Sequence, residues 1–267
     1  MSHGNAFPAR ENQFSGRAKY PGINADTPYL DVGRIQGTGR RTVHTIIVIN
    51  PKGGCGKSTL AMNVAGFFAC WGVAVELIDL DPQSSCLDWL ETRPQSLPRI
   101  AGDRSFAFEP AHKRGIDYRV IDVPSSCFDD ATQTLLVDAD TVIIPLMASI
   151  NDFRATMKFL KEVEKLRNRI DGKNHIGFVA NRIKHNTRSF SYLKEFVRQT
   201  DIPCRGVLRD TQNYVRAAES GLSIFELPGR AVASDLRQWQ RIIRWLCMDQ
   251  SVSVHIPLPV AYEQSEF

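Results

Sequence analysis

The sequence lacks any hydrophobic run long enough to cross a membrane. Its most apolar stretches, 43–49 and 142–146, are only as long as buried strands. The first residues lack the apolar core of a signal peptide. No CxxC pair and no metal-binding spacing occurs among the cysteines, which stand at positions 55, 70, 86, 127, 204 and 247. We therefore expect a cytoplasmic protein with reduced thiols and no membrane contact.

The composition is otherwise that of an ordinary globular protein. Of 267 residues, 43% are hydrophobic and 23% charged, and the net charge is +4. This mildly basic balance permits nucleic-acid binding without requiring it. We predict one domain over 43–248 and a short tail over 249–267. Residues 1–42 show no sustained period and carry a net charge of +3, which indicates a flexible tail or, alternatively, a contact arm for DNA or a partner.

The most informative stretch is 44–60, where a β-branched strand, a glycine-rich turn and an apolar-periodic helix follow one another. The turn nearly matches the phosphate-loop pattern G-x-x-x-x-G-K-[ST], with Pro51 in place of the first glycine. The three glycines at 53, 54 and 56 would let backbone N–H groups surround phosphate oxygens. Lys57 would reach the β- and γ-phosphates, and the Ser58 hydroxyl would bind Mg²⁺. The alternative, a glycine-rich turn that binds nothing, is disfavoured by Gly-Lys-Ser-Thr directly after a strand.

These residues also carry a resemblance. The segment Lys-Gly-Gly-Cys-Gly-Lys-Ser-Thr, 52–59, resembles the deviant Walker A motif of the ParA/MinD family of P-loop ATPases. The resemblance implies that ATP binds along the segment, at Lys52, Gly53, Gly54, Cys55, Gly56, Lys57, Ser58 and Thr59. It also implies that Lys52 is the family's signature lysine, which reaches across a nucleotide-sandwich homodimer to the partner's ATP. Cys55 stands where the family has small side chains, and we assign it no role of its own.

Acidic residues follow two further predicted strands. The strand 73–80 runs into Asp79-Leu80-Asp81-Pro82-Gln83, and 118–122 ends in Asp122. Acids at the carboxyl ends of parallel strands stand in the ligand crevice, where Mg²⁺ and phosphate would offset their mutual repulsion. By resemblance, Asp81 positions the attacking water and Asp122 is the Walker B residue that holds Mg²⁺, so we predict metal contacts at Ser58, Asp81 and Asp122. Asp79 is interpreted as a strand-end or metal-shell acid.

The alternation of strands and helices predicts an α/β fold with a mostly parallel twisted sheet flanked by helices. The resemblance implies that this is the P-loop NTPase fold of the SIMIBI type. We predict further helices over 84–92, 129–137, 151–170, 189–199 and 231–247, and strands over 106–108, 141–146, 175–180 and 204–208. The charges of 151–170 are interpreted as a solvated surface. In ParA-like ATPases an Asn at the end of the strand that corresponds to 175–180 contacts adenine. The resemblance therefore assigns this role to Asn181. Arg182 either stacks on the base or is an ordinary surface residue.

The last predicted helix carries Arg237, Arg241 and Arg244 on one face. This arrangement suits contact with the DNA backbone, whereas the alternative is a solvated face with local salt bridges. MinD-type relatives end in a cationic helix that lies on the membrane. Here 249–267 has no Lys or Arg and contains two prolines, at 257 and 259, which disfavours a membrane role.

The resemblance implies a slow, Mg²⁺-dependent partition or positioning ATPase. Its ATP-bound dimer would bind nonspecific nucleoid DNA and be released when an adaptor or activating partner stimulates hydrolysis. The cargo would be a plasmid, a chromosome region or a protein assembly such as a microcompartment. A second hypothesis is a nucleotide switch that acts through protein contacts without binding DNA. An iron–sulfur relative is disfavoured, because Cys127 follows Asp122 but no second cysteine is suitably placed.

Overall fold

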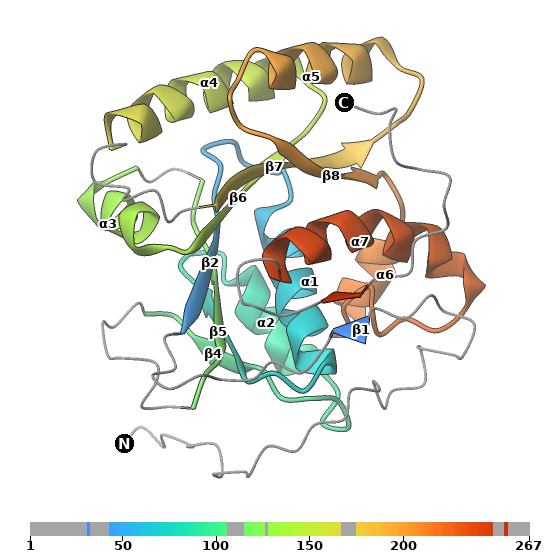
Figure 1. The fold of residues 1–267 in the computed structure, drawn as a ribbon. Coiled ribbons are helices and arrows are strands. Elements are labelled where there is room, and N and C mark those ends of the chain that lie inside the picture. The colour runs from blue at the N-terminus through green and yellow to red at the C-terminus, as the bar shows by residue number, and fades with distance from the viewer. Residues whose placement is uncertain are drawn as a thin grey trace.

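A central parallel sheet forms the core of the computed structural model, which describes residues 31–32, 43–105, 115–125, 128–166, 175–247 and 254–255 (Figure 1). The sheet has seven strands in the order β4-β3-β5-β2-β6-β7-β8. Their bounds are β2 His44–Val48, β3 Val75–Asp79, β4 Ala101–Asp103, β5 Tyr118–Asp122, β6 Thr141–Leu146, β7 His175–Ile183 and β8 Cys204–Arg209. Every pairing in this sheet is parallel, so all seven carboxyl ends lie at one edge.

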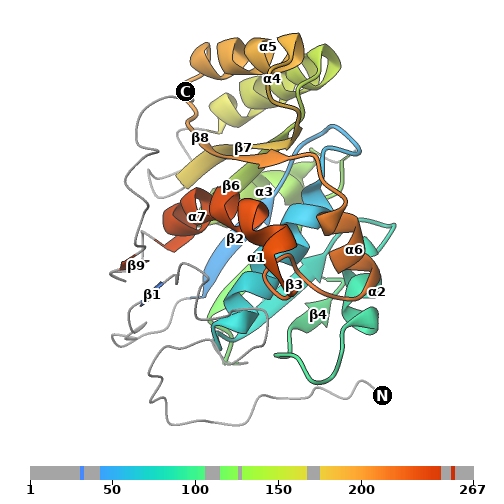
Figure 2. The ribbon, with the colours of Figure 1, turned by 90° about the vertical axis from the view of Figure 1, so that its right-hand side faces the viewer.

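Helices cover both faces of the sheet, giving three layers (Figures 1 and 2). One face carries α1 Lys57–Cys70, α2 Ser85–Thr92 and α7 Ala233–Cys247, with the short α6 Asn213–Glu219 beside them. The other carries α3 Asp130–Asp138, α4 Ile150–Lys165 and α5 Arg188–Arg198. The predicted α/β fold with a parallel sheet flanked by helices is therefore confirmed.

The alternation of side chains along β2 explains why both faces are covered. Ile46 and Val48 belong to the hydrophobic cluster beneath α1 and α7, whereas Ile47 belongs to the cluster beneath α3, α4 and α5. Because successive strand residues point to opposite faces, an uninterrupted apolar run produces two cores. Helix α1 is buried on nearly all sides, and it ends where Gly72 adopts a φ of 74° and donates to the Ala69 carbonyl at 2.9 Å.

Most predicted elements are present, with a few corrections. Sequence reasoning missed β4 and α6, and it ended β7 three residues early, before Asn181. The apolar spacing of the 151–170 helix predicts Phe153, Met157, Leu160 and Val163 on one face with the charges opposite, but the Met157 side chain is exposed. Helix α4 is described only to Lys165, so its predicted continuation to 170 lies outside the described residues, as do the strand 106–108, Ser126 and Cys127.

The two segments predicted as tails are described only where they meet. Asp31–Val32, β1, pairs antiparallel with Val254–His255, β9. The rest of 1–42 and 249–267 lies outside the described residues, so the division into a domain and two tails stays a prediction. No helix in the described part of the chain combines the length and apolarity that a membrane crossing needs.

Candidate functional site

The glycine-rich loop joins β2 to α1 and leaves the start of the helix open. Gly54 and Gly56 have φ values of 78° and 95°, which side-chain-bearing residues rarely adopt. Gly56 occupies the N-cap position of α1, where no side chain caps the helix. The first N–H groups of α1 therefore lack side-chain partners and, with the helix dipole, form a site suited to an anion. Lys57 is 6% exposed and lines the adjoining pocket.

Two buried asparagines hold the loop in place. Asn50 Oδ1 accepts from the Lys52 backbone N–H at 2.9 Å, while its Nδ2 donates to the Pro145 carbonyl at 2.7 Å. Asn181 Nδ2, from β7, donates to the Cys55 carbonyl at 2.9 Å. A Cβ on Gly56 would collide with that same amide nitrogen. These hydrogen bonds tie the loop to β6 and β7.

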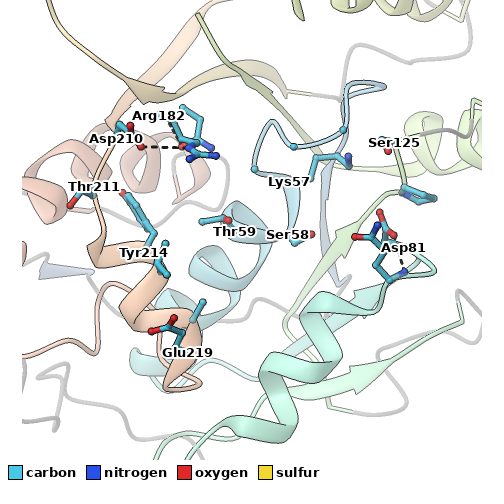
Figure 3. Close-up of a pocket in the computed structure, with 18 of the residues that line it drawn as sticks. Lys57, Ser58, Thr59, Asp81, Ser125, Arg182, Asp210, Thr211, Tyr214 and Glu219 are labelled. Atoms are coloured by element: carbon cyan, nitrogen blue, oxygen red, sulfur yellow. Dashed lines mark hydrogen bonds and ion pairs between the residues drawn. The ribbon is translucent and has the colours of Figure 1, made fainter.

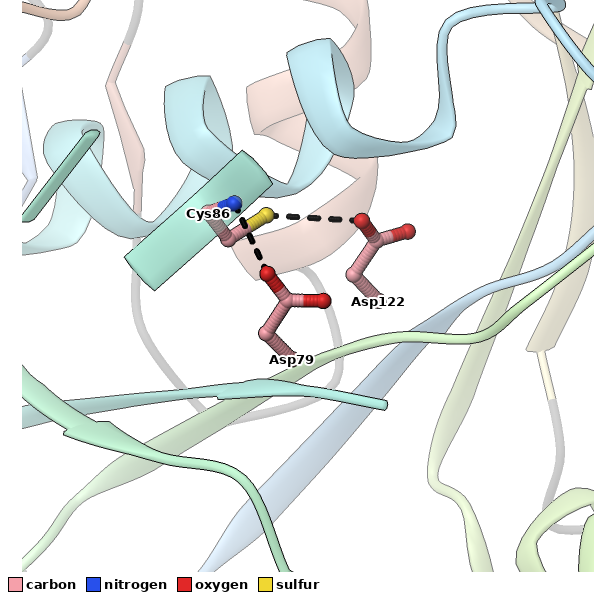
Figure 4. Close-up of side chains that lie close together, drawn as sticks. All are labelled: Asp79, Cys86 and Asp122. Atoms are coloured by element: carbon pink, nitrogen blue, oxygen red, sulfur yellow. Dashed lines mark hydrogen bonds between the residues drawn. The ribbon is translucent and has the colours of Figure 1, made fainter. Parts of the chain in front are cut away.

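Two carboxylates lie side by side behind the loop. Asp79 and Asp122 are paired in register at the ends of β3 and β5. Cys86, in the first turn of α2, joins them: its backbone N–H donates to Asp79 at 2.8 Å and its thiol donates to Asp122 at 3.4 Å (Figure 4). All three residues are buried. Sequence reasoning had assigned no role to Cys86, because nothing in the sequence shows that its helix begins against both strand ends.

Burial sets the charge properties of this cluster. Desolvation raises the pKa of Asp122 to about 6, and the neighbouring Asp79 charge acts in the same direction. Burial also raises the pKa of Asp79, although three backbone N–H groups oppose the shift. The Asp122 Oδ1 atom is buried and has no hydrogen-bond partner in the described structure. A buried carboxylate oxygen without a donor fits a divalent cation or one of its water ligands, so this site suits Mg²⁺.

Asp81 lies apart from the buried pair, on the pocket wall. Its carboxylate accepts from the Gln83 backbone N–H at 3.0 Å, and its own N–H donates to Asp79 at 3.0 Å. The ligand atoms that lie within 4.8 Å of one another belong to Asp79, Cys86 and Asp122, so Asp81 is outside that group. The structure therefore places Asp79, and not Asp81, beside the predicted Mg²⁺ residue Asp122.

The pocket is a cavity of about 740 Å³ with two distinct ends (Figure 3). Lys57, Ser58, Asp81 and Ser125 lie at one end, whereas Arg182, Asp210, Thr211 and Tyr214 lie at the other. Of the residues predicted to bind nucleotide, the following line the cavity: Gly53, Gly54, Gly56, Lys57, Ser58, Thr59, Asn181 and Arg182. Lys52 and Cys55 do not line it. Cys55 is fully buried, and its thiol donates to the Lys52 carbonyl at 3.1 Å.

The end of the pocket away from the phosphate loop includes residues that sequence reasoning missed. Asp210 follows β8 and forms exposed ion pairs with Arg182 at 3.5 Å and Lys184 at 3.8 Å. Arg182 has a φ of 54°, an uncommon value for a residue with a side chain, at a register shift between β7 and β8. Asp210 lies two residues past the predicted strand 204–208, close to the strand-end position that identified Asp79 and Asp122, so the sequence did contain a pointer to it.

The arginines predicted to bind DNA lie outside the pocket on α7. Arg237 and Arg241 are exposed, Arg244 is half-buried, and Arg237 donates to the Ser234 hydroxyl at 2.8 Å. The three share one helix face, as predicted, and none of them lines the cavity.

Comparison with known proteins gives a consistent result. Residues 46–224 match the model of the CobQ/CobB/MinD/ParA nucleotide binding domain. The chain is 26% identical over 207 residues to the maintenance of carboxysome distribution protein A of Halothiobacillus neapolitanus, covering 73% of this chain and 93% of that protein. It is also 27% identical over 161 residues to the chromosome-partitioning ATPase Soj of Thermus thermophilus, covering 48% and 64% of the two chains.

Two solved structures share the fold. A Cyanothece McdA variant in complex with ATP superposes with a TM-score of 0.57 at 17% identity, covering 76% of this chain and 97% of that one. A putative plasmid partition protein from Borrelia burgdorferi bound to AMPPNP gives a TM-score of 0.58 at 18% identity, covering 76% and 99%.

Proposed function

The chain belongs to the CobQ/CobB/MinD/ParA nucleotide-binding family, and from this premise we propose that it is an ATP-driven positioning protein that works as a dimer on DNA. Its relatives are partition and positioning ATPases. The observation that carries the proposal is the open N-terminus of α1 beside Lys57, with the unpartnered Asp122 oxygen behind it. A triphosphate at the helix and a cation at the carboxylate would satisfy both.

We assign the chemistry to the residues around the phosphate end of the pocket. Mg²⁺, when bound, neutralises phosphate charge as it develops during hydrolysis. Ser58 and Asp122 would hold the cation, and Lys57 would bind the β- and γ-phosphates. Asp81, on the pocket wall with a half-buried carboxylate, would orient the attacking water. Catalysis of this kind depends on positioning and on fixed charge, since the protein forms no covalent intermediate.

The position of Lys52 supports a dimer. Lys52 is half-buried at the start of the loop and does not line the cavity of its own chain. A lysine that the family uses across a dimer interface would have this placement. We therefore propose that ATP closes a homodimer through Lys52 and that an adaptor or activating protein stimulates slow hydrolysis. We also propose a cytoplasmic location on the nucleoid and a plasmid, chromosome region or protein assembly as cargo.

Two substitutions test the proposed chemistry. Lys57→Ala should abolish ATP binding in equilibrium titration, because the phosphates lose the positive charge of the Lys57 side chain. Asp81→Ala should keep ATP affinity and lose about 100-fold in hydrolysis rate, as expected when a water-orienting group is removed. Full ATPase activity of the Asp81 variant would contradict its assignment. Size-exclusion chromatography of Lys52→Ala with ATP tests the dimer, which this variant should fail to form.

DNA binding is tested separately on α7. Replacing Arg237, Arg241 and Arg244 with Gln should weaken ATP-dependent binding to plain duplex DNA and reduce the slope of its salt dependence. Arg244 is half-buried and Arg237 already bonds Ser234, which favours the second hypothesis, a switch that acts through proteins alone. Wild-type protein that hydrolyses ATP but binds no DNA would establish that alternative.

A further inference from the structure

Helices α4 and α5 carry three of the four large hydrophobic side chains that are exposed in the described residues. The four exposed side chains are Ile150 at 58%, Met157 at 37%, Tyr192 at 57% and Val215 at 48%. Val215 lines the nucleotide pocket, whereas the other three belong to α4 and α5. None of these three lines the pocket, so the described site does not explain their exposure.

These three side chains surround a single aromatic contact. Phe153 of α4 stacks on Phe196 of α5 with ring centroids 4.8 Å apart and planes at 14°. Ile150 and Met157 are three residues before and four residues after Phe153, and Tyr192 is four residues before Phe196. Residues at these spacings are neighbours on a helix surface. The exposed apolar side chains therefore border the seam between the two helices from both sides.

A row of cations runs beside this seam. Arg154, Lys158 and Lys161 are exposed and lie at i, i+4 and i+7 on α4. None of them forms a hydrogen bond or ion pair with a described residue, in contrast to Lys165, which pairs with Glu162 at 2.8 Å. Within 150–161 the acid is Asp152, which is 1% exposed, and Glu162 and Glu164 follow four residues after Lys158 and three after Lys161. Along roughly 10 Å of helix, the described structure thus presents three exposed cations that form no ion pair with a described residue.

We propose that this α4–α5 face, defined by Ile150, Arg154, Met157, Lys158, Lys161 and Tyr192, docks an acidic, amphipathic segment of a partner protein. Apolar residues of the segment would cover the seam, and its acids would pair with the three exposed cations. The inference deepens the proposed function, since it names the chemistry of a partner that acts on the ATPase. It assigns that partner to the side of the sheet opposite α7 (Figure 2).

The mixed character of the face selects this occupant over others. A DNA backbone offers charge but little apolar surface, so it would leave the exposed apolar side chains in contact with water. The cationic row is also short, because Glu162 follows it and pairs with Lys165. A short row beside an apolar seam matches one or two turns of a peptide helix, in which acids and apolar residues alternate at i, i+3 and i+4.

The test uses a fluorescently labelled synthetic peptide and nucleotide-free protein, so that it depends on neither ATP hydrolysis nor DNA binding. The peptide is designed as a helix with Leu on one face and Glu on its flank. Matched peptides carry Gln for Glu or Ser for Leu. Wild-type protein should bind the first peptide, and either replacement should weaken binding about tenfold or more.

Protein variants place the peptide on the surface. R154Q/K158Q/K161Q should weaken binding about tenfold, and Met157→Ser should weaken it several-fold. R237Q/R241Q/R244Q removes the same charge from the other face and should retain wild-type affinity. Hydrogen exchange should show protection over 150–161 when the peptide binds. All of these side chains are exposed or half-buried, and unchanged thermal melting will confirm that each variant is folded.

Several results would overturn the proposal. No peptide binding, or equal loss in the α4 and α7 variants, would show that the face has no peptide specificity. Displacement of the peptide by duplex DNA would assign the row to nucleic acid. Binding to phosphatidylglycerol vesicles that is lost in the α4 variant would assign it to a membrane. Self-association of the wild type that the α4 variant lacks would assign it to a second copy of the chain.

Discussion

The two ends of the pocket are built in different ways. At the phosphate end, Lys57, Asp79 and Asp122 are nearly or fully buried, and the loop in front of them is fixed by hydrogen bonds to its backbone. At the other end, the Arg182 and Asp210 side chains are 61% and 36% exposed and meet through a long ion pair. The phosphate end is thus preorganised, whereas the opposite end depends on exposed side chains whose charges are screened by solvent.

A substitution at Gly56 should remove the preorganisation of the phosphate end most completely. Gly56→Ala should reduce ATP affinity at least about 100-fold, because the new Cβ would meet the Asn181 amide and because the φ of 95° strains any side-chain-bearing residue. Equilibrium titration with labelled ATP measures the loss. Gly53→Ala is the matched control: its Cβ would lie 3.7 Å from Ser125 Oγ, an ordinary contact, and should cost far less. Equal losses would mean that the loop is not rigid.

The same contrast explains what could be predicted from the sequence. Lys57, Ser58 and Asp122 were identified because backbone spacing and the shared edge of a parallel sheet fix their positions. Cys86 was missed because its contact with both carboxylates depends on where α2 begins in space. Asn181 was predicted to contact adenine, yet the structure shows it bonded to the Cys55 carbonyl, so its role toward a base stays a prediction.

The elements that were missed share a physical cause. Strand β4 has three residues at the edge of the sheet, including a glycine, and shows no alternation that a period could reveal. Strand β7 continues past Ala180 only because Arg182 accepts a positive φ at a register shift with β8. Local propensity disfavours a strand at β4 and at the end of β7, and pairing with a neighbouring strand determines both.

The titration of Asp122 tests whether the phosphate end of the pocket is destabilised when no cation is bound. Its pKa of about 6 in the folded protein lies above the ordinary 3.8, chiefly because of burial. Between pH 4 and 6 the folded state therefore keeps a proton that the unfolded state has lost, and stability falls as pH rises. Above about pH 6 this costs roughly 3 kcal/mol in the absence of metal.

Asp122→Asn should remove that slope and make the metal-free protein more stable at pH 7. Denaturant unfolding of both proteins from pH 4 to 7 measures the difference, and carboxylates distant from Asp122 cancel in the comparison. The Asn variant should also lose the stabilisation that Mg²⁺ and ATP give the wild type. A pH-independent difference between the two proteins would contradict the raised pKa.

Asn181 connects the two ends of the pocket, because its side chain bonds the Cys55 carbonyl of the loop and the Arg182 N–H. Its substitution therefore tests which end the side chain serves. Asn181→Ala would leave the Cys55 carbonyl and the Arg182 N–H without their partner, at a cost of about 1–3 kcal/mol. If its main task is to support the loop, ATP and GTP affinities should fall by the same factor. A loss confined to ATP would show that the side chain reads the base. Competition titration with both nucleotides separates the two outcomes.

The smallest effect is expected at the exposed end. Arg182→Gly removes a side chain that pairs with Asp210 only through solvent-screened contacts, and it places glycine where φ is 54°. Relief of about 1 kcal/mol of strain should offset the lost pair, so the free energy of unfolding should change by less than about 1 kcal/mol. ATP affinity then distinguishes the two interpretations of Arg182. A fall of several-fold, absent for inorganic triphosphate, would mean that the guanidinium stacks on the base. An unchanged affinity for both would mark Arg182 as a surface residue and leave recognition of the base to the segment between Asp210 and Glu219.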